Sequence, residues 1–245
     1  MAREAAREPR ITVAADAGAL AALAAAEIAR TATRAAEARG LAAIALAGGS
    51  TPIRTYRRLA EPEEHEGVPW ERVLFFFGDE RCVPPDHPDS NTRMVREALL
   101  ARLPIPAANV FRMAGELDDP ERAAAAYEAD LRQELGPAPR LDLAILGMGV
   151  DGHVASLFPG SPALEERTRL VCAATGGQPQ PRRLTLTLPA LCAARAVLFL
   201  VSGAEKAGTV AEVLAGRRPD LPASRVRPEG EVHWLLDPEA ASRIR

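Results

Sequence analysis

Four short apolar runs, each followed by a glycine-containing polar segment, constrain the fold of this chain more than any other feature. They lie at 41–47 (LAAIALA), 73–77 (VLFFF), 141–146 (LDLAIL) and 196–201 (AVLFLV). Runs without regular alternation of apolar and polar residues are typical of strands buried on both faces of a parallel sheet. Because helical segments separate the runs, the sequence predicts an α/β fold, a mostly parallel sheet with helices on both faces.

Helical periodicity and capping residues fill the intervals between the runs. In the first interval, Asp16 can cap a helix whose apolar side includes Leu20, Leu23 and Ile28, and Gly40 can end it. Further helices are expected to start at Ser50 or Thr51, at Ser90, at Asp119 and after Ser202, and further strands at 11–13, 184–188 and 232–236. No repeat or domain linker interrupts this order, so residues 1–245 are predicted to form one domain.

Charge, hydropathy and cysteine content argue against several classes of protein. The formal net charge is −3, and no basic stripe or basic amphipathic segment indicates binding to nucleic acid or to a membrane surface. No run reaches the roughly 18 apolar residues of a spanning helix, and the polar first ten residues lack a signal-peptide core. The 3 widely spaced cysteines, without a CxxC pair, favour a reducing compartment. We therefore expect a cytoplasmic protein.

The polar segments that follow the four runs are predicted to form a single site. They read GGST at 48–51, GDER at 78–81, GMGVDGH at 147–153 and SGAEK at 202–206. Ligands of open parallel sheets bind outside the carboxyl ends of the strands. If the four strands are neighbours, their loops converge there.

Two of these segments suit an anion. Gly48 and Gly49 let the backbone approach a ligand, and Ser50 and Thr51 add hydroxyl donors where a helix begins. An ordinary strand-to-helix turn has the same residues, and that alternative stays open. Lys206 lies in the first turn of the predicted helix and opposes its dipole, a local cost that a bound anion would offset. A surface lysine at a tolerated position is the alternative.

The third segment supplies a predicted general base. An imidazole titrates near neutral pH, so His153 can accept a proton, and Asp151 can hold its tautomer. Gly149 and Gly152 leave room around the histidine and are candidates for substrate contact. A lone histidine is usually structural, so this prediction depends on the position of His153 at the carboxyl end of a buried strand.

Other charged residues are candidates for substrate binding. Asp79 can bind sugar hydroxyls or orient a water, and Arg81 can bind phosphate or pair with an acidic neighbour. Arg183, just before the predicted strand at 184–188, is a further phosphate candidate, although a surface arginine in a loop is the commoner situation. Cys82 has no evident base nearby to activate its thiol and is interpreted as a small buried residue.

Metal and dinucleotide sites are both disfavoured. One histidine and one aspartate without a nearby cysteine give too few ligands for a metal. Gly147, Gly149 and Gly152 match the string GxGxxG, but Pro159 and Pro162 follow where a dinucleotide fold needs a helix. We expect no cofactor and no metal.

The motifs resemble those of the 6-phosphogluconolactonase family. The two longest are FFFGDERCVPPDHPDSNTRMVREALL at 75–100 and LGMGVDGHVASLFPGSPAL at 146–164, and LAGGSTP, RLTLTLPAL and VSGAEKA follow the family's order. The resemblance covers nearly the whole chain and implies a modified Rossmann-like fold. It also implies hydrolysis of 6-phospho-D-glucono-1,5-lactone to 6-phospho-D-gluconate, the second step of the oxidative pentose phosphate pathway, without a cofactor.

Two alternatives accompany this resemblance. The related glucosamine-6-phosphate isomerase/deaminase family carries a ring-opening glutamate soon after DGH, whereas Phe158 stands at that position here. A non-enzymatic sugar-phosphate sensor is the other alternative, but such regulators carry a DNA-binding module, and residues 1–10 are too short for one.

The resemblance also suggests how the residues divide the reaction. The 6-phosphate is expected near 48–51, with Lys206 and Arg81 supplying positive charge. His153 would activate water and Asp151 would orient it, while Asp79 would hold sugar hydroxyls. Backbone N–H groups of 147–152 are candidate donors to the oxyanion. The expected partner is a small sugar phosphate, and the expected state is a monomer, with a weak homodimer as the alternative.

Overall fold

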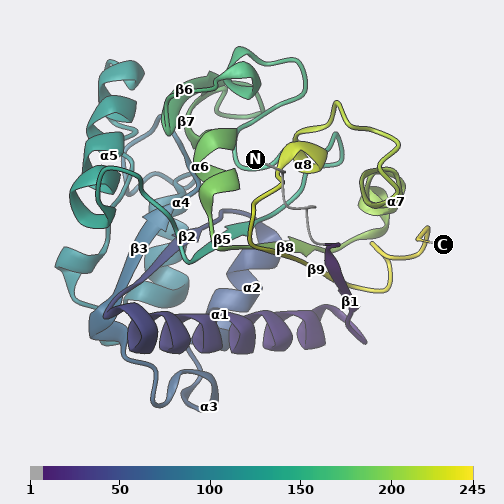
Figure 1. The fold of residues 1–245 in the computed structure, drawn as a ribbon, viewed down its shortest axis with the longest axis horizontal. Coiled ribbons are helices and arrows are strands. Elements are labelled where there is room, and N and C mark those ends of the chain that lie inside the picture. Colours follow the sequence, from purple (N-terminus) through teal and green to yellow (C-terminus); the bar gives the residue numbers. More distant parts are fainter. Residues whose placement is uncertain (1–7, 245) are drawn as a thin grey trace, which may run out of the picture.

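A six-stranded parallel sheet forms the centre of the fold, which the computed structural model describes for residues 8–244 (Figure 1). Along the sheet the order is β1-β9-β8-β5-β2-β3, and every neighbouring pair is parallel. The strands are β1 (Arg10–Val13), β2 (Ala42–Leu46), β3 (Val73–Phe77), β5 (Leu143–Leu146), β8 (Ala196–Val201) and β9 (Glu231–Leu236). The chain runs outward from β2 to β3 and then returns to β5 on the other side of β2. This reversal leaves a crevice at the carboxyl ends of the strands, where ligands of such sheets bind.

Alternate residues of the central strands face two separate hydrophobic clusters. On β2, Ile44 and Leu46 belong to the cluster beneath the sheet in Figure 1, whereas Ala43 and Ala45 belong to the cluster above it. All 5 residues of β2 are buried. The prediction of strands buried on both faces is therefore confirmed.

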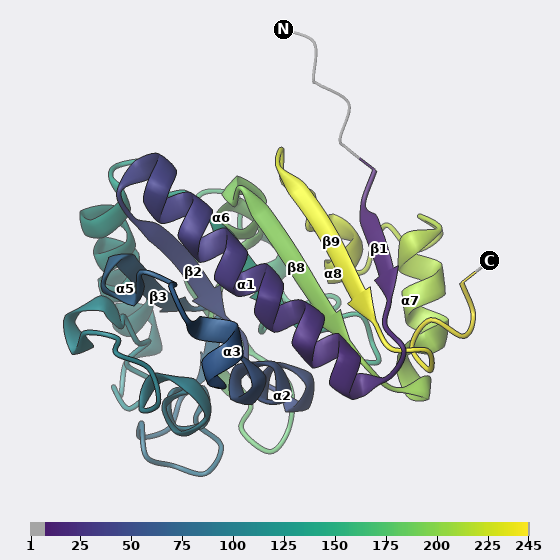
Figure 2. The same ribbon diagram turned by 90° about the horizontal axis from the view of Figure 1, so that it is seen from below.

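Helices cover both faces of this sheet, which confirms the predicted α/β architecture (Figures 1 and 2). One face carries α1 (Ala17–Arg39) and α2 (Ser50–Leu59), and the other carries α5 (Pro120–Leu135), α6 (Leu188–Ala193), α7 (Ala207–Leu214) and α8 (Pro222–Arg225). The shorter elements are α3 (Pro62–His65), α4 (Asn91–Val95), a π-helical turn (Arg96–Leu100) and four 3₁₀ turns (Trp70–Arg72, Ala107–Asn109, Pro162–Glu165 and Ala204–Lys206). Between residues 8 and 244, no helix combines the length and apolar character that crossing a membrane requires.

The ends of α1 lie where the sequence predicts them. The carboxylate of Asp16 accepts a hydrogen bond from the Ala19 amide at 2.8 Å, and Gly40 ends the helix with φ of 84°. Leu23 was expected on the apolar side, but its side chain is exposed, because the buried side of α1 is formed by Leu20, Ile28 and six alanines.

The starts of two other helical segments differ from the prediction. Gly49, with φ of 108°, holds the N-cap position of α2, so Ser50 and Thr51 are its first helical residues and make no capping hydrogen bond. Lys206 ends the 3₁₀ turn before α7 instead of lying in the first turn of an α-helix.

A second, antiparallel sheet was not predicted. It consists of β4 (Asp79–Arg81), β7 (Arg182–Leu186) and β6 (Val171–Thr175), in the order β4-β7-β6. The strand expected at 184–188 ends earlier, because Thr187 caps α6 and Leu188 begins that helix. Only Gly78 separates β3 from β4, and its carbonyl accepts a hydrogen bond from Leu186. The second sheet therefore joins the first at the carboxyl end of β3.

Candidate active site

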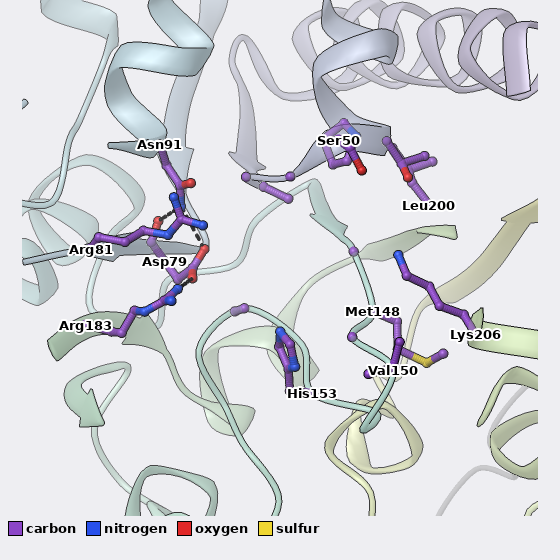
Figure 3. A pocket seen from close by; sticks show the side chains of 18 residues that line it. Ser50, Asp79, Arg81, Asn91, Met148, Val150, His153, Arg183, Leu200 and Lys206 are labelled. Carbon is purple, nitrogen blue, oxygen red and sulfur yellow. Dashed lines mark hydrogen bonds and ion pairs between the residues drawn. The ribbon is translucent and has the colours of Figure 1, made fainter. Parts of the chain in front are cut away.

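A cavity of about 360 Å³ lies at the reversal between β2 and β5 (Figure 3). All four polar segments that were predicted to converge contribute residues to its lining, so they do meet at one cavity. The lining comprises Ala47, Gly48, Gly49, Ser50, Thr51, Pro52, Asp79, Arg81, Asn91, Gly147, Met148, Gly149, Val150, His153, Ala155, Arg183, Leu200 and Lys206. The volume falls within the range of small-molecule sites, roughly 300–1,000 Å³.

His153 is paired with Asp151 inside a tight loop. The distance between His153 Nδ1 and Asp151 Oδ1 is 2.6 Å. Because an ionised carboxylate only accepts hydrogen bonds, Nδ1 is the donor in this pair, and in the neutral imidazole the lone pair then lies on Nε2. The Gly149 amide donates to the His153 carbonyl at 3.0 Å, and a Cβ on Gly149 would lie 2.1 Å from Nδ1. Only glycine at position 149 therefore lets the imidazole fold back over its own loop.

Two residues of this loop lie behind the cavity. Asp151 contacts His153 but is not part of the lining. Gly152 is buried with φ of 81°, packs against Leu221, and accepts a hydrogen bond from the Ala223 amide through its carbonyl. The structure thus places Gly152 as a turn residue outside the lining, away from the substrate contact predicted for it.

Asp79 lies at the centre of a buried hydrogen-bond network. Its side chain is 9% exposed, and its Oδ2 accepts a hydrogen bond of 2.6 Å from Ser156 Oγ. The Asn91 amide group donates to both the carboxylate, at 3.1 Å, and the carbonyl of Asp79, at 2.9 Å. Arg183 adds an ion pair whose N–O distance is 3.9 Å. The carboxylate is thereby held in one orientation at the cavity wall.

The site also contains Asn91 and Ser156, which the sequence did not indicate, and a third residue, Glu80, holds Asn91 in place. Glu80 is almost fully buried, and its carboxylate accepts hydrogen bonds from the amides of Asn91 and Thr92 at 2.7 and 2.8 Å. The start of α4 is therefore fixed by an acidic residue, as helix N-termini favour. The GDER motif contained the signal, because an acidic pair directly after a buried strand needs buried partners.

Two arginines stand side by side across the second sheet. Arg81 on β4 is paired in register with Arg183 on β7. Arg81 donates to the Asp89 carbonyl, and its buried Nε has no hydrogen-bond partner among residues 8–244. Arg183 is buried, its Nε donates to the Gln180 carbonyl at 2.7 Å, and this burial lowers the pKa of its guanidinium although the Asp79 carboxylate opposes the shift. The explanation of Arg183 as a surface arginine in a loop is therefore wrong.

Lys206 provides the positive charge at the opposite end of the cavity. In Figure 3 its ammonium group points into the cavity, across from Arg81 and Arg183. Asp237 fixes its loop by accepting hydrogen bonds from Ser202 Oγ at 2.5 Å and from the Gly203 amide. Burial alone would raise the pKa of Asp237, but these hydrogen bonds and the charge of Lys206 lower it.

The 48–51 segment lines the cavity between Asn91 and Lys206. Tyr56 of α2 is fully buried, and its hydroxyl bonds both the N–H and the C=O of Ala47, which directly precede the turn. A Cβ on Gly48 would lie 2.0 Å from the Asn91 side chain, so close packing requires glycine there. The first residues of α2, Ser50 and Thr51, then border the cavity, and the first amides of a helix have no partner within the helix.

Thiol and metal chemistry find little support in the described side chains. Burial raises the pKa of the half-buried Cys82 thiol, which disfavours the thiolate that a nucleophile needs. Within residues 8–244, no three His, Cys, Asp or Glu side chains are grouped closely enough to hold a metal ion.

Comparisons with known proteins agree on one family. A family model described as glucosamine-6-phosphate isomerases/6-phosphogluconolactonase matches residues 15–234. The 6-phosphogluconolactonase of Synechocystis sp. is 44% identical over 220 residues, which cover 87% of this chain and 89% of that protein. The solved 6-phosphogluconolactonase of Trypanosoma brucei is 35% identical with a TM-score of 0.85, and the match covers 97% of this chain and 99% of that one. A monomeric glucosamine-6-phosphate deaminase is 25% identical with a TM-score of 0.83, covering 96% and 99%. This chain therefore belongs to the glucosamine-6-phosphate isomerase/6-phosphogluconolactonase family.

Proposed function

We propose that this protein hydrolyses 6-phospho-D-glucono-1,5-lactone to 6-phospho-D-gluconate, the second step of the oxidative pentose phosphate pathway. One observation carries the proposal: the Asp151–His153 pair leaves Nε2 as a free base in a cavity with positive charge at both ends. Two relatives that are named 6-phosphogluconolactonase match this chain along most of their own length.

In the proposed reaction, His153 Nε2 takes a proton from water while the water oxygen attacks the C1 carbonyl. The tetrahedral intermediate then collapses, the bond from C1 to the ring oxygen breaks, and His153 returns the proton to that oxygen. Asp151 stabilises the imidazolium between these two transfers. Positioned acid–base catalysis of this kind contributes roughly 10²–10⁴ in rate.

Binding of the substrate is divided between the two ends of the cavity. Gly48, Gly49, Ser50, Thr51 and Lys206 would hold the 6-phosphate at the start of α2. Asp79 would accept hydrogen bonds from sugar hydroxyls, with Arg81 and Arg183 beside it. The amides of Gly149 and Gly152 already donate to carbonyls, so the arginine pair is the stronger source of charge for the oxyanion. The orientation of the substrate can be tested with Lys206→Ala, which should raise KM if Lys206 holds the 6-phosphate. If the substrate bound the other way round, with its phosphate at the two arginines, Lys206→Ala would leave KM unchanged.

We further propose that residues 1–245 act as one domain, as a monomer, in the cytoplasm. Both hydrophobic clusters pack against the same sheet, which supports one domain, and the 3 cysteines are free thiols, as in a reducing compartment. Light scattering that gives the mass of a single chain would support the monomer, and twice that mass would contradict it.

The test is hydrolysis of freshly generated lactone, with the spontaneous rate subtracted. The unmodified enzyme should accelerate the reaction, His153→Ala should lose that acceleration, and His65→Ala in α3, away from the lining, should retain it. Failure of the unmodified protein to exceed the spontaneous rate would refute the lactonase. Formation of fructose 6-phosphate from glucosamine 6-phosphate would then identify the deaminase.

A further inference from the structure

The ring of Phe158 contacts two residues of the active site, His153 and Arg183. Its centroid lies 4.7 Å from that of His153, with the two planes tilted by 39°. The guanidinium carbon of Arg183 lies 6.0 Å from the same centroid, at the outer limit of a cation–π contact. Phe158 itself is outside the cavity lining, so it touches the proposed base without touching the space for substrate.

The loop between β6 and β7 packs its backbone directly against this ring. A Cβ on Gly176 would lie 2.5 Å from Cδ2 of Phe158, and a Cβ on Gly177 would lie 3.0 Å from Cζ. A Cβ atom does not come as close as 2.5 Å to another heavy atom to which it is not bonded, so a side chain at position 176 would have to displace the ring. The two glycines therefore act as a wall that fixes where the ring lies.

The segment that carries Phe158 is also fixed. Leu157 donates a backbone hydrogen bond to Val154 at 2.9 Å, and both residues are fully buried. Ser156, equally buried, bonds the Asp79 carboxylate. Phe158 thus leaves a rigid turn, and its ring meets the glycine wall and His153.

Two contacts already restrain the His153 ring near Nδ1, namely the hydrogen bond to Asp151 and the close packing of Gly149. Because the χ2 torsion of histidine is broad, these contacts leave the tilt of the ring to be limited by its neighbour Phe158. We propose that Phe158, backed by Gly176 and Gly177, is a positioning residue that fixes the plane of the His153 ring and so aims Nε2 into the cavity. This inference rests on the proposed function, in which Nε2 takes the proton from water.

The test separates orientation of the base from binding of the substrate. Phe158→Leu keeps an apolar side chain but removes the flat surface, so we expect kcat to fall by roughly 10- to 100-fold, as misplaced catalytic groups do. KM should stay within about twofold, because the 6.0 Å contact between Arg183 and the Phe158 ring is weak and Arg183 keeps its contacts with Asp79 and Gln180. Gly176→Ala should reproduce the fall in kcat by pushing the ring, with Phe158 itself unchanged.

Gly67→Ala is the matched control for the glycine variant. Gly67 also has positive φ, 77°, but a Cβ there would meet nothing within 4 Å. It therefore carries backbone strain without touching Phe158, and its kcat should equal that of the unmodified enzyme. Melting temperatures identify which variants are folded, and Gly176→Ala carries the test if Phe158→Leu does not fold.

Two kinds of result would overturn the inference. A folded Phe158→Leu variant with unchanged kcat, or with a loss confined to KM, would show that Phe158 does not act through His153. A Gly176→Ala variant as active as Gly67→Ala would show the same for the glycine wall. Failure of the unmodified protein to exceed the spontaneous rate is a separate result, which would remove the proposed function and this inference together.

Discussion

Asp151→Asn isolates the contribution of the carboxylate to the proposed base. The change keeps the size of the side chain, and Asp151 is outside the cavity lining, so binding of the substrate should change little. The variant loses a charge-assisted hydrogen bond of 2.6 Å to the imidazolium that forms during the reaction. In addition, the amide NH₂ can donate to Nδ1 of His153, which would move the ring proton to Nε2 and block the base.

The structure sets the size of the effect. Hydrogen bonds to charged groups contribute about 1.5–3 kcal/mol, and the lower half applies here because the Asp151 side chain is 47% exposed. At 1.36 kcal/mol per tenfold change, this corresponds to a fall in kcat of roughly 10- to 50-fold with KM nearly constant.

The assay is lactone hydrolysis over a range of pH, corrected for the spontaneous reaction. Asp220→Asn is the matched control, since Asp220 pairs with Arg218 on the surface, away from the cavity lining. If Asp151→Asn kept kcat within twofold of the unmodified enzyme across that range, or raised KM alone, then Asp151 does not support the base.

Three further predictions concern stability and the Lys206 loop. Tyr56→Phe should lower the free energy of unfolding by roughly 1–3 kcal/mol, because the peptide groups that it clamps at the end of β2 lose their partner; a change below about 0.5 kcal/mol in urea would contradict this. Burial and the neighbouring Arg10 lower the pKa of His233 to about 4, below the ordinary 6.5, so the unfolded chain takes up the proton first as the pH falls. Stability should therefore drop by roughly 1–3 kcal/mol between about pH 6.5 and pH 4, and His233→Asn should flatten that part of the curve; equal slopes would refute the assignment. Asp237→Asn should raise KM roughly 3- to 10-fold by loosening the loop of Lys206, and a KM equal to that of the unmodified enzyme would show that the loop keeps its position without the carboxylate.

The sequence predicted those parts of the molecule whose signal is local. Uninterrupted apolar runs that end in glycines identified the central strands, and Asp16 and Gly40 marked the ends of α1. The second sheet escaped because β4 has 3 residues and β7 begins with two arginines, which normally indicate surface. The buried position of Arg183 depends on β4 and β6 beside it, a relation that local patterns do not contain.

Within the site, the same distinction applies. His153 and Asp151 are two residues apart, so their pairing could be predicted from the motif. Ser156 and Asp79 are 77 residues apart, and only the folded chain brings the hydroxyl to the carboxylate. The positions of the phosphate-binding candidates agree with the predicted loops, whereas their partners, such as Asp237, come from long-range contacts.

Two buried tyrosines should slow the exchange of backbone amide hydrogens with solvent at the carboxyl ends of β2 and β3. Tyr56 clamps both peptide groups of Ala47, and Tyr127 of α5 does the same at Phe77, the last residue of β3. Burial raises the pKa of both phenols, so they stay protonated and keep donating and accepting at once. The amide hydrogens of Ala47 and Phe77 should then exchange with deuterium only through global unfolding, while those of the polar loops exchange through local opening. Substrate entry and product release would accordingly involve motion of the loops, while the carboxyl ends of β2 and β3 stay closed to local unfolding.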